Sequence, residues 1–322
     1  MILIVGSGLT SRLRTIADAY AICKIKQWNL DIRWPLDYMC GAKPEDILDI
    51  KKMNDVSTEW HTYRKCRFLA KKDVKEAISK RHYFSAIYKA IRWILIRKFF
   101  SFIKIVLIKA KIIISFYPPK HYEPKSEEYK QHIISARKEL IQRIDNNIEP
   151  KVDAFCGILS EQDKDRFGTS LHSIKFKEEI VNAAEKINVN SEMIGLHIRR
   201  TDHAVCIRNS PREAFVEIVE KQIKQNPSSQ IYLATDDEEE EKFFKDTYGE
   251  TIVTIKHKAW EKDSIAGIKT AIIEMLCLSQ CKEIYGSYTS VFSGYAAEYG
   301  NIDLWVCSLE SKGKWYKVRA KK

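Results

Sequence analysis

Residues 194–202 read IGLHIRRTD, and this stretch decides the fold that the sequence predicts. A short apolar run is followed at once by two arginines, which is typical of a buried strand that ends in a charged loop. Alternation places His197 and Arg199 on one side of the strand. An arginine at a strand end can bind a phosphate through two parallel N–H donors, but a salt bridge with Asp202 would explain it equally well. The stretch therefore predicts either a phosphate-binding strand end or a structural ion pair.

The rest of the C-terminal half alternates strand and helix patterns. Short apolar runs typical of buried strands lie at residues 193–198, 230–234, 251–255, 283–285 and 304–307. Helical patterns lie at residues 211–225, 237–247, 265–279 and 292–299. Strands separated by helices of this length predict a parallel sheet with right-handed crossovers, in which ligands bind at the carboxyl ends of the strands.

Two other predicted strand ends carry polar side chains. Asp236 follows the second strand, where a carboxylate can accept hydrogen bonds from a base or a ribose, and the glutamates after Asp237 are typical of a solvated first helical turn. Residues 286–290 follow the fourth strand and lead into a helix that begins near Val291. Hydroxyl and N–H groups at a helix N-terminus suit the phosphates of a nucleotide, although an ordinary N-cap has the same residue types.

The N-terminal half opens with a second unit of the same kind. Residues 2–5 predict a strand, Gly6-Ser7-Gly8 a tight turn, and residues 13–21 a helix. The turn lacks the third glycine of a dinucleotide fingerprint and the Gly-Lys-Ser/Thr of a P-loop. We expect helices between Lys51 and Lys151. The fold class that follows is α/β, with two Rossmann-like domains facing a cleft, at residues 1–187 and 188–322.

Three C-terminal motifs resemble, in order and spacing, those of the α-1,6-fucosyltransferase and nodulation fucosyltransferase superfamily. They are IGLHIRRTD at 194–202, IYLATDD at 231–237, and YGSYTSVFS at 285–293 with AAE at 296–298. GSGLTSRL at 6–13 and WPLD at 34–37 also resemble the openings of bacterial relatives. The resemblance covers residues 1–50 and 192–308, and it implies a GT-B fold with GDP-fucose bound mainly by the C-terminal domain.

The resemblance also implies roles for individual residues. His197 and Arg199 would form the donor-binding pair, with Arg199 neutralising the diphosphate as its bond to the sugar breaks. Asp236 and Asp237 would approach the guanine–ribose end of the donor, and Glu274 would contact the donor from a helix. The other donor-binding residues that it implies are Arg200, Ser287, Thr289, Ser290 and Val291 in the C-terminal domain, and Gly6, Gly8 and Arg12 in the N-terminal domain.

The chemistry implied by the resemblance is an inverting transfer that uses no metal or other cofactor. GDP leaves as an acceptor hydroxyl attacks from the opposite face, and the phosphate charge that develops must be stabilised. Arg199 and the helix N-terminus at Ser290 would provide that stabilisation. Asp236 and Asp237 are adjacent, so they do not form the Asp-x-Asp motif of metal-dependent transferases.

The general base and the acceptor do not carry over from the resemblance. Ile207 stands where the α-1,6 branch has a candidate glutamate base, so Asp202 and His203 are the nearest titratable alternatives. Ser11 replaces an asparagine that is common in bacterial relatives. We expect a glycan acceptor in surface polysaccharide, lipopolysaccharide or glycolipid synthesis, without a residue that identifies it.

The positive charge of the chain comes almost entirely from one segment. The chain has 54 Lys and Arg against 43 Asp and Glu, a formal charge of +11, and residues 77–122 hold ten of the basic residues and no acidic one. A helical wheel from Arg97 to Ile114 separates an aromatic and aliphatic face from a basic face. Such a basic amphipathic insertion predicts peripheral contact with an anionic membrane, and the alternative is a core helix with a solvated basic face. Nucleic acid is the least favoured partner.

The cysteines and the N-terminus indicate a cytoplasmic location, peripheral on the inner membrane face if the basic insertion binds lipid. Eight cysteines occur without a CxxC pair or the spacing of a zinc site. We therefore expect the chain to have no disulfides and no structural metal. The chain shows neither a signal peptide nor an apolar run of about 18 residues. Two competing functions remain: a GT-B transferase that uses another nucleotide sugar, and a non-catalytic basic protein that binds membranes or nucleic acid.

Overall fold

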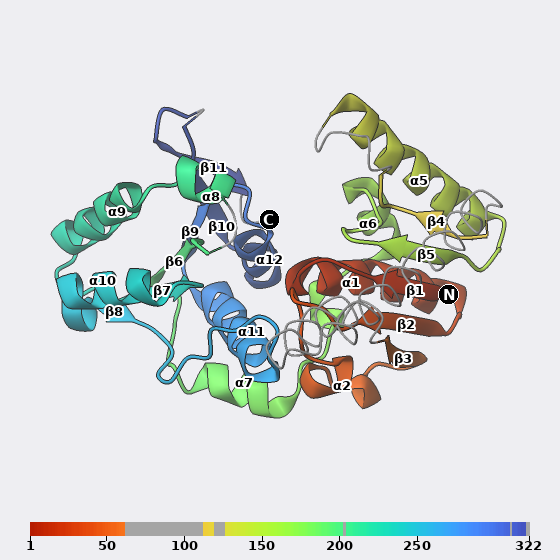
Figure 1. Cartoon of the computed structure of the whole chain (residues 1–322), viewed down its shortest axis with the longest axis horizontal. Helices are drawn as coiled ribbons and strands as arrows, with labels where there is room; N and C mark the ends of the chain where they lie inside the picture. Colours follow the sequence, from red (N-terminus) through yellow and green to blue (C-terminus); the bar gives the residue numbers. More distant parts are fainter. Residues whose placement is uncertain (62–111, 119–125, 202–203, 310, 320–322) are drawn as a thin grey trace, which may run out of the picture. The chain divides into compact units, whose positions relative to one another are not determined.

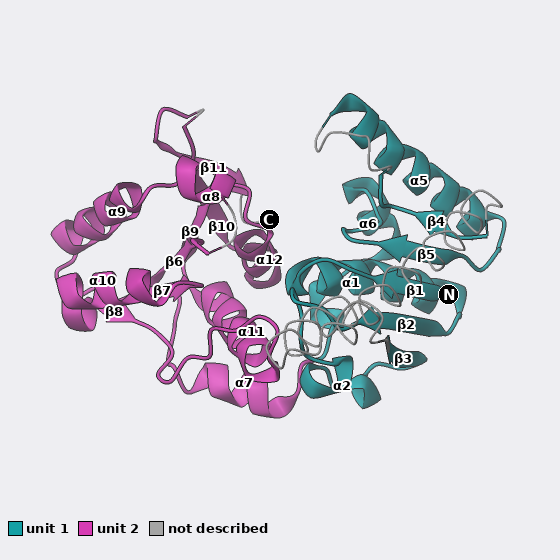
Figure 2. Cartoon of the chain, in the orientation of Figure 1, with its two compact units in different colours: residues 1–175 teal, residues 176–322 magenta. Residues whose placement is uncertain are grey.

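The computed structural model describes residues 1–61, 112–118, 126–201, 204–309 and 311–319. The chain divides into two compact units, residues 1–175 (unit 1) and 176–322 (unit 2), which are coloured separately in Figure 2. Each unit contains its own sheet, in agreement with the expected pair of Rossmann-like domains (Figure 1).

Unit 1 is built on a parallel sheet with the strand order β3-β2-β1-β5-β4. The strands are β1 (Ile2–Val5), β2 (Leu30–Pro35), β3 (Val56–His61), β4 (Ile114–Ser115) and β5 (Lys151–Ala154). The helices described in this unit are α1 (Leu9–Lys26), α2 (Pro44–Ile47), α5 (Glu127–Asp145) and α6 (Glu161–Phe167), with short 3-10 turns at Ile50–Lys52 and Leu171–Ser173. β1 lies in the centre of the sheet, where Leu3 is buried beside Ile32 and Val152.

Two strands of unit 1 correct the expectation of helices alone between Lys51 and Lys151. β3 pairs in parallel with β2, and β4 pairs with β5 through Ile114 opposite Val152. Ile114, expected on the apolar face of the basic helix, is buried in the sheet instead. β3 reads VSTEWH and is mostly polar, because an edge strand needs little apolar sequence.

The remainder of the predicted basic insertion, residues 77–111 and 119–122, lies outside the described residues. Its contact with a membrane therefore stays a prediction. Among the helices that the structure does describe, none has the length and apolar character needed to cross a membrane.

Unit 2 confirms the predicted alternation of strands and helices. Its sheet has the order β11-β10-β9-β6-β7-β8, in which only the described pair β10 and β11 is antiparallel. The strands are β6 (Ile194–Ile198), β7 (Ile231–Thr235), β8 (Ile252–Val253), β9 (Glu283–Ser287), β10 (Asp303–Cys307) and β11 (Trp315–Arg319). The helices are α7 (Glu178–Glu185), α8 (Ala204–Asn209), α9 (Arg212–Gln225), α10 (Glu238–Tyr248), α11 (Ile265–Gln280) and α12 (Val291–Gly300), and the last 3-10 turn is Gly249–Thr251.

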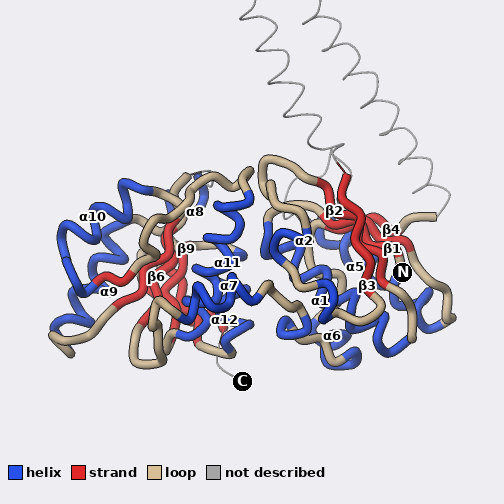
Figure 3. Tube along the Cα trace, turned by 90° about the horizontal axis from the view of Figure 1, so that it is seen from below, coloured by secondary structure: helices blue, strands red, loops and turns tan. Residues whose placement is uncertain are grey.

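Helices cover both faces of the sheet of unit 2. α9 and α10 lie on one face, and α7, α11 and α12 lie on the other (Figure 3). All five residues of β6 and of β7 are buried, as expected for central parallel strands. Leu196, Leu233 and Phe215 belong to the core on the side of α9 and α10.

The two units meet at residue 175/176, twelve residues before the expected boundary at 187/188. The difference is α7, which packs against α11 of unit 2. Cys277 of α11 points its thiol at the carbonyl of Ala184, and Lys269 of α11 pairs with Glu179 at 2.6 Å.

Candidate functional site

The three strand ends singled out in the sequence converge in unit 2. β6 pairs with β7 on one side and with β9 on the other, so the strand order reverses at β6, which is where open α/β sheets bind ligands. Ser287 at the end of β9 joins two of the ends: its Oγ accepts a hydrogen bond from the Arg199 N–H at 3.0 Å and donates to the His197 carbonyl at 3.2 Å. The Arg200 N–H donates to Asp236 Oδ1, just after β7, at 2.7 Å.

Asp236 organises a cluster of charged and polar groups at these strand ends. Its Oδ2 lies 2.6 Å from Thr201 Oγ1, 3.1 Å from Lys262 Nζ and 3.4 Å from Arg199 Nη1. We call Arg199, Thr201, Asp236 and Lys262 the strand-end cluster. Burial alone would raise the pKa of Asp236, but the hydrogen bonds from Thr201 and Arg200 and the two nearby cations together hold it well below its usual value. Asp236 is therefore ionised across the physiological pH range.

Arg199 remains partly accessible within the strand-end cluster. Its side chain is 22% exposed and that of Asp236 is 15% exposed. The sequence left open whether Arg199 binds phosphate or only pairs with Asp202. The structure adds a pairing with Asp236, across two strands, which holds the guanidinium at the carboxyl edge of the sheet.

His197 is buried beneath this edge and stacks on Phe292. The two ring centroids are 4.8 Å apart, and the histidine is 5% exposed. Burial, with the neighbouring Arg199 charge as a second cause, lowers the pKa of His197 to about 3, so the imidazole is neutral. Its Nδ1 has no hydrogen-bond partner among the described residues. A neutral imidazole can accept or donate one hydrogen bond at each nitrogen, according to its tautomer.

Arg200 and Asp237 differ from the donor-binding roles that the resemblance implied. Arg200 Nη2 lies 3.2 Å from the buried Glu240, and its Nη1 donates to the carbonyls of Arg199 and Ser210. Asp237 caps α10, because its Oδ1 accepts the Glu240 N–H at 2.8 Å. Arg200 thus fastens the loop after β6 to α10, and Asp237 stabilises the first turn of that helix.

Glu274 is buried in α11 and pairs with Lys258, a residue that the sequence analysis did not select. Lys258 Nζ lies 2.5 Å from Glu274 Oε1 and 3.5 Å from Glu241 Oε2, and it also donates to the Thr235 carbonyl at the end of β7. Burial raises the pKa of Glu274 to about 7, against the opposing effect of Lys258. At 7% exposure, Glu274 serves in this structure to anchor the loop between β8 and α11.

The polar side chains of the turn between β9 and α12 do not all lie at the surface: Ser287 is buried, whereas Thr289 is exposed. Ser287 is 1% exposed and holds β6, as described above. Thr289 is exposed and has a left-handed φ of 56°, and Ser290 is the N-cap of α12 without a side-chain capping bond. Val291, the first residue of α12, is 50% exposed.

Contacts from α8 and the residue after it hold this turn in place. Cys206 Sγ donates to the Tyr288 carbonyl at 2.8 Å, and the Tyr288 N–H donates to Ser210 Oγ at 2.9 Å. Ile207, on the same helix, is 39% exposed. The other two candidate bases, Asp202 and His203, lie outside the described residues and stay predictions.

Unit 1 places its predicted site residues in the turn between β1 and α1. The Gly6 N–H donates to the Ala154 carbonyl at 2.9 Å, and Gly8 precedes α1 as its N-cap. Arg12 is 0% exposed and its guanidinium is used inside unit 1, so its expected donor contact stays a prediction. It donates to the Ser7 carbonyl at 2.8 Å and pairs with Asp37 at 3.0 Å.

Arg12 also reaches beyond this turn to the next strand. Its Nη1 donates to the carbonyl of Pro35 at the end of β2, and its guanidinium lies 4.9 Å from the ring centre of Trp34. The residue therefore positions the turn between β1 and α1 against β2.

Lys258 and Lys262 are the site residues that sequence reasoning missed. Both come from the loop between β8 and α11, at positions that match no motif. Their position after a strand of an α/β unit, on either side of Trp260, could have indicated them, because loops at the carboxyl ends of strands carry ligand contacts. No group of three or more potential metal-ligating side chains occurs within the described parts of the chain.

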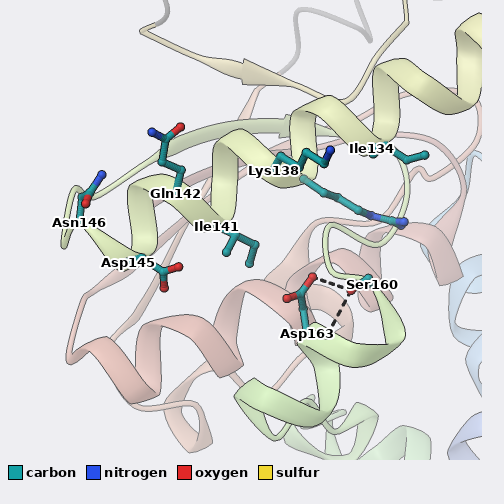
Figure 4. Close-up of a pocket in the computed structure, with 9 residues that line it drawn as sticks. Ile134, Lys138, Ile141, Gln142, Asp145, Asn146, Ser160 and Asp163 are labelled. Atoms are coloured by element: carbon teal, nitrogen blue, oxygen red, sulfur yellow. Dashed lines mark hydrogen bonds between the residues drawn. The ribbon is translucent and has the colours of Figure 1, made fainter.

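A separate cavity in unit 1 contains none of the predicted site residues. It has a volume of about 630 Å³ and lies between α5 and α6 (Figure 4). Ile134 and Ile141 contribute apolar surface, and Asp163 bonds to Ser160 at its rim. Its basic and acidic side chains are mixed, so it favours neither an anion nor a cation.

Comparisons with known proteins give a consistent result for the fold. No protein family model matches the sequence, and no curated protein matches it. NodZ α-1,6-fucosyltransferase soaked with GDP-fucose is similar in structure, with a TM-score of 0.54 and 14% identity over 99% of each chain. NodZ from Bradyrhizobium in another crystal gives a TM-score of 0.51 and 13% identity over 99% of this chain and 98% of its own. A mutant of Arabidopsis thaliana FUT1 in complex with GDP gives a TM-score of 0.51 and 11% identity over 95% of this chain and 69% of its own. The chain therefore has the two-domain α/β fold of the NodZ and FUT1 fucosyltransferases.

Proposed function

We propose that this protein is an inverting glycosyltransferase that transfers fucose from GDP-fucose to a glycan acceptor. The observation that carries the proposal is the position of Arg199, held by Asp236 and Ser287 at the carboxyl end of β6, where the strand order of unit 2 reverses. The shared fold with NodZ, a structure of which was soaked with GDP-fucose, supports the same assignment.

The chemistry follows from charge. Breaking the bond between the sugar and the diphosphate leaves negative charge on GDP, and a fixed guanidinium stabilises that charge more in the transition state than in the ground state. Arg199 needs little reorganisation, because its backbone and its side chain are each already bonded to a neighbouring strand end. A single displacement by an acceptor hydroxyl inverts the anomeric carbon, and this route requires no metal.

His197 would contribute a neutral group to the same site. Because its pKa lies near 3, it does not gain a positive charge near pH 7 and does not add to the charge on Arg199. Asp202 and His203 remain the proposed candidates for the base that deprotonates the acceptor, which we propose to be a glycan of a surface polysaccharide, lipopolysaccharide or glycolipid.

Arg199→Ala tests the assignment. We expect transfer of fucose from GDP-fucose to fall by at least about a hundredfold, the usual cost of removing one group that stabilises transition-state charge. Arg166→Ala is the matched control, because Arg166 is also an arginine paired with an aspartate, Asp145, but lies in unit 1. Full transfer activity in Arg199→Ala would refute the proposal.

A donor panel separates this proposal from a transferase for another nucleotide sugar. GDP-fucose, other GDP-sugars and UDP-sugars would each be added to the protein in a thermal-shift assay, since a ligand that binds the folded state raises the melting temperature. We expect the largest rise with GDP-fucose. A larger rise with a UDP-sugar would replace the proposed donor.

We further propose that the protein acts in the cytoplasm, with the basic segment of residues 77–122, apart from its buried strand β4 at Ile114–Ser115, in contact with the inner membrane face. The support is the concentration of ten basic residues in that segment. Sedimentation with anionic vesicles, but not with neutral ones, is the expected result. Equal sedimentation with both kinds, or with neither, would contradict it.

A further inference from the structure

Lys262 places a second cation beside Arg199. Its Nζ lies 3.1 Å from Asp236 Oδ2 and 3.1 Å from Thr201 Oγ1, so it shares one carboxylate oxygen with the Arg199 guanidinium. The Lys262 side chain is 32% exposed, which leaves part of it open to a ligand. The two cations come from different segments of unit 2, the end of β6 and the loop before α11.

The loop that carries Lys262 is tied to the sheet and to α11 at several points. Lys258, whose side chain is 4% exposed, bonds to the end of β7 and pairs with the buried Glu274. Ser264 caps α11 by accepting the Gly267 N–H at 2.9 Å, and its hydroxyl donates to the Glu261 carbonyl at 3.0 Å. The position of Lys262 is therefore fixed by its neighbours and does not depend on its own ion pair.

Gly267 shows how closely the loop approaches the helix. A Cβ atom at this position would lie 2.0 Å from the Glu261 carbonyl oxygen, far inside van der Waals contact. The residue next to Lys262 thus passes directly over the first turn of α11, and only glycine leaves room for that path.

The charges of these groups fit a diphosphate. Arg199 and Lys262 bring two positive charges to the single negative charge of Asp236. The Asp236 carboxylate holds both cations in place without a ligand. An arriving diphosphate has more negative charge and more acceptor oxygens than one carboxylate, so it can bond to both cations at once. A compact ammonium group is well suited to bind phosphate oxygens as a point charge.

We propose that Lys262 is a second diphosphate-binding residue, which acts with Arg199 on the donor. This inference rests on the proposed function, because it assumes that a nucleoside diphosphate occupies the carboxyl end of β6. It assigns the loop between β8 and α11, which matches none of the motifs, to recognition of the phosphates.

The test is a binding series with guanosine, GMP and GDP, measured by calorimetry on the full chain. We expect Lys262→Met to weaken GDP binding by about tenfold to a hundredfold, the range of a hydrogen bond between charged groups. The loss should be smaller for GMP and absent for guanosine. Lys262→Arg should retain GDP binding within about threefold, because it keeps the charge.

Lys269→Met is the matched control for this series. Lys269 lies in α11, just after the loop that carries Lys262. Its side chain is 33% exposed, and it pairs with Glu179 of α7 at 2.6 Å, outside the strand-end cluster. GDP binding by Lys269→Met should equal that of the wild type.

The outcomes separate the two proposals. If the wild type binds GDP and Lys262→Met binds it equally well, the role of Lys262 is overturned and the proposed function stands. If Lys262→Met loses affinity for guanosine as much as for GDP, Lys262 acts only through the structure of the site, and the inference is also overturned. If the wild-type protein binds neither GDP nor GDP-fucose, the proposed function itself fails and the inference fails with it.

Discussion

Unit 1 and unit 2 each contain an arginine that pairs with an aspartate at the end of a neighbouring parallel strand, but the two pairs differ in burial. In unit 1, Arg12 lies in the first turn of α1, the helix that follows β1, and pairs at 3.0 Å with Asp37, which follows β2. In unit 2, Arg199 follows β6 and pairs at 3.4 Å with Asp236, which follows β7. The side chains of the first pair are 0% and 6% exposed, and those of the second pair are 22% and 15% exposed.

The difference shows that position after a strand does not decide whether an arginine stays accessible to a ligand. Arg12 is enclosed by Trp34 and by the carbonyls of Ser7 and Pro35, so its charge is used within the fold. Arg199 lies directly at the end of β6, keeps an accessible edge, and shares its aspartate with Lys262. The same pair of residue types therefore stabilises one unit and prepares a site in the other.

The largest expected effect comes from removing the buried arginine. Arg12→Ala removes a cation from beside the carboxylate of Asp37, whose side chain is 6% exposed. Breaking a buried ion pair by removing one partner costs about 3–5 kcal/mol, so we expect the free energy of unfolding to fall by this amount in urea denaturation. Arg199→Ala is the comparison and should lower it by less than about 1 kcal/mol, because its pair is partly solvated.

The comparison is contradicted if Arg12→Ala affects GDP binding and Arg199→Ala affects stability. A stable Arg12→Ala protein that has lost GDP binding would show that Arg12 reaches the donor. An unfolded Arg199→Ala protein would show that the strand-end cluster is structural.

A second prediction extends the comparison to pH. Asp18 of unit 1 is buried and accepts the N–H groups of Ile158 and Leu159, and burial raises its pKa to about 6. The folded state therefore holds a proton on Asp18 that the unfolded state releases near its ordinary pKa of 3.8. The contribution of Asp18 to stability falls as the pH rises from about 4 to about 6, by up to about 3 kcal/mol, and is constant above that range.

Asp236 of unit 2 has the opposite sign. Because its pKa is depressed in the folded state, its stabilising contribution is full at neutral pH and is lost only as the pH falls below its ordinary value. The measurement is urea denaturation between pH 4 and 7 of the wild type, Asp18→Asn and Asp236→Asn. The fall attributed to Asp18 should be absent in Asp18→Asn and present in Asp236→Asn, and a fall that persists in Asp18→Asn would contradict the assignment.

The smallest expected effect tests how the loop of Lys262 is held. Gly267→Ala would place a methyl group against Glu261, so we expect a loss of about 1–3 kcal/mol in stability and weaker GDP binding as Lys262 shifts. Gly294→Ala in α12 is the control, because no described atom lies within 4 Å of its added Cβ, and alanine favours a helix by about 1 kcal/mol over glycine.

The two glycine variants also separate the two cations. If Gly267→Ala binds GDP as tightly as Gly294→Ala, the loop can shift without consequence, and Arg199 alone carries the interaction. Unit 2 would then use a single cation, as unit 1 does in the Arg12 pair.

The elements of unit 2 could be predicted because apolar runs and helical spacing both signal burial. β6 and β7 are buried on both faces, and α9 and α10 begin close to the expected residues, whereas the short helix α8 was not expected. β11, with the sequence WYKVR, was not expected, because it is an antiparallel edge strand whose polar residues face solvent. The same pattern also identifies Arg199 and Asp236 as strand-end residues, because the end of an apolar run marks the end of a strand.

The contacts of the site residues could not be read from the sequence. Arg12 and Arg199 both belong to motifs that follow a strand, and their exposure depends on what packs around them in three dimensions. Lys262 lies in a loop, where spacing carries no periodic signal, and its approach to Asp236 requires the path over Gly267. Glu274 was selected as a donor contact, but its buried partner Lys258 lies sixteen positions away in the chain and could be found only from the fold.

The packing of α7 determines where the chain can be cut. α7 covers α11, with the thiol of Cys277 directed at the carbonyl of Ala184 and Ile180 buried between them. A fragment that starts at the boundary expected from sequence, residue 188, would strip this cover and expose an apolar helix face and a thiol to solvent. A fragment that starts at Phe176 retains the cover, so truncation at that residue is the rational way to express unit 2 by itself.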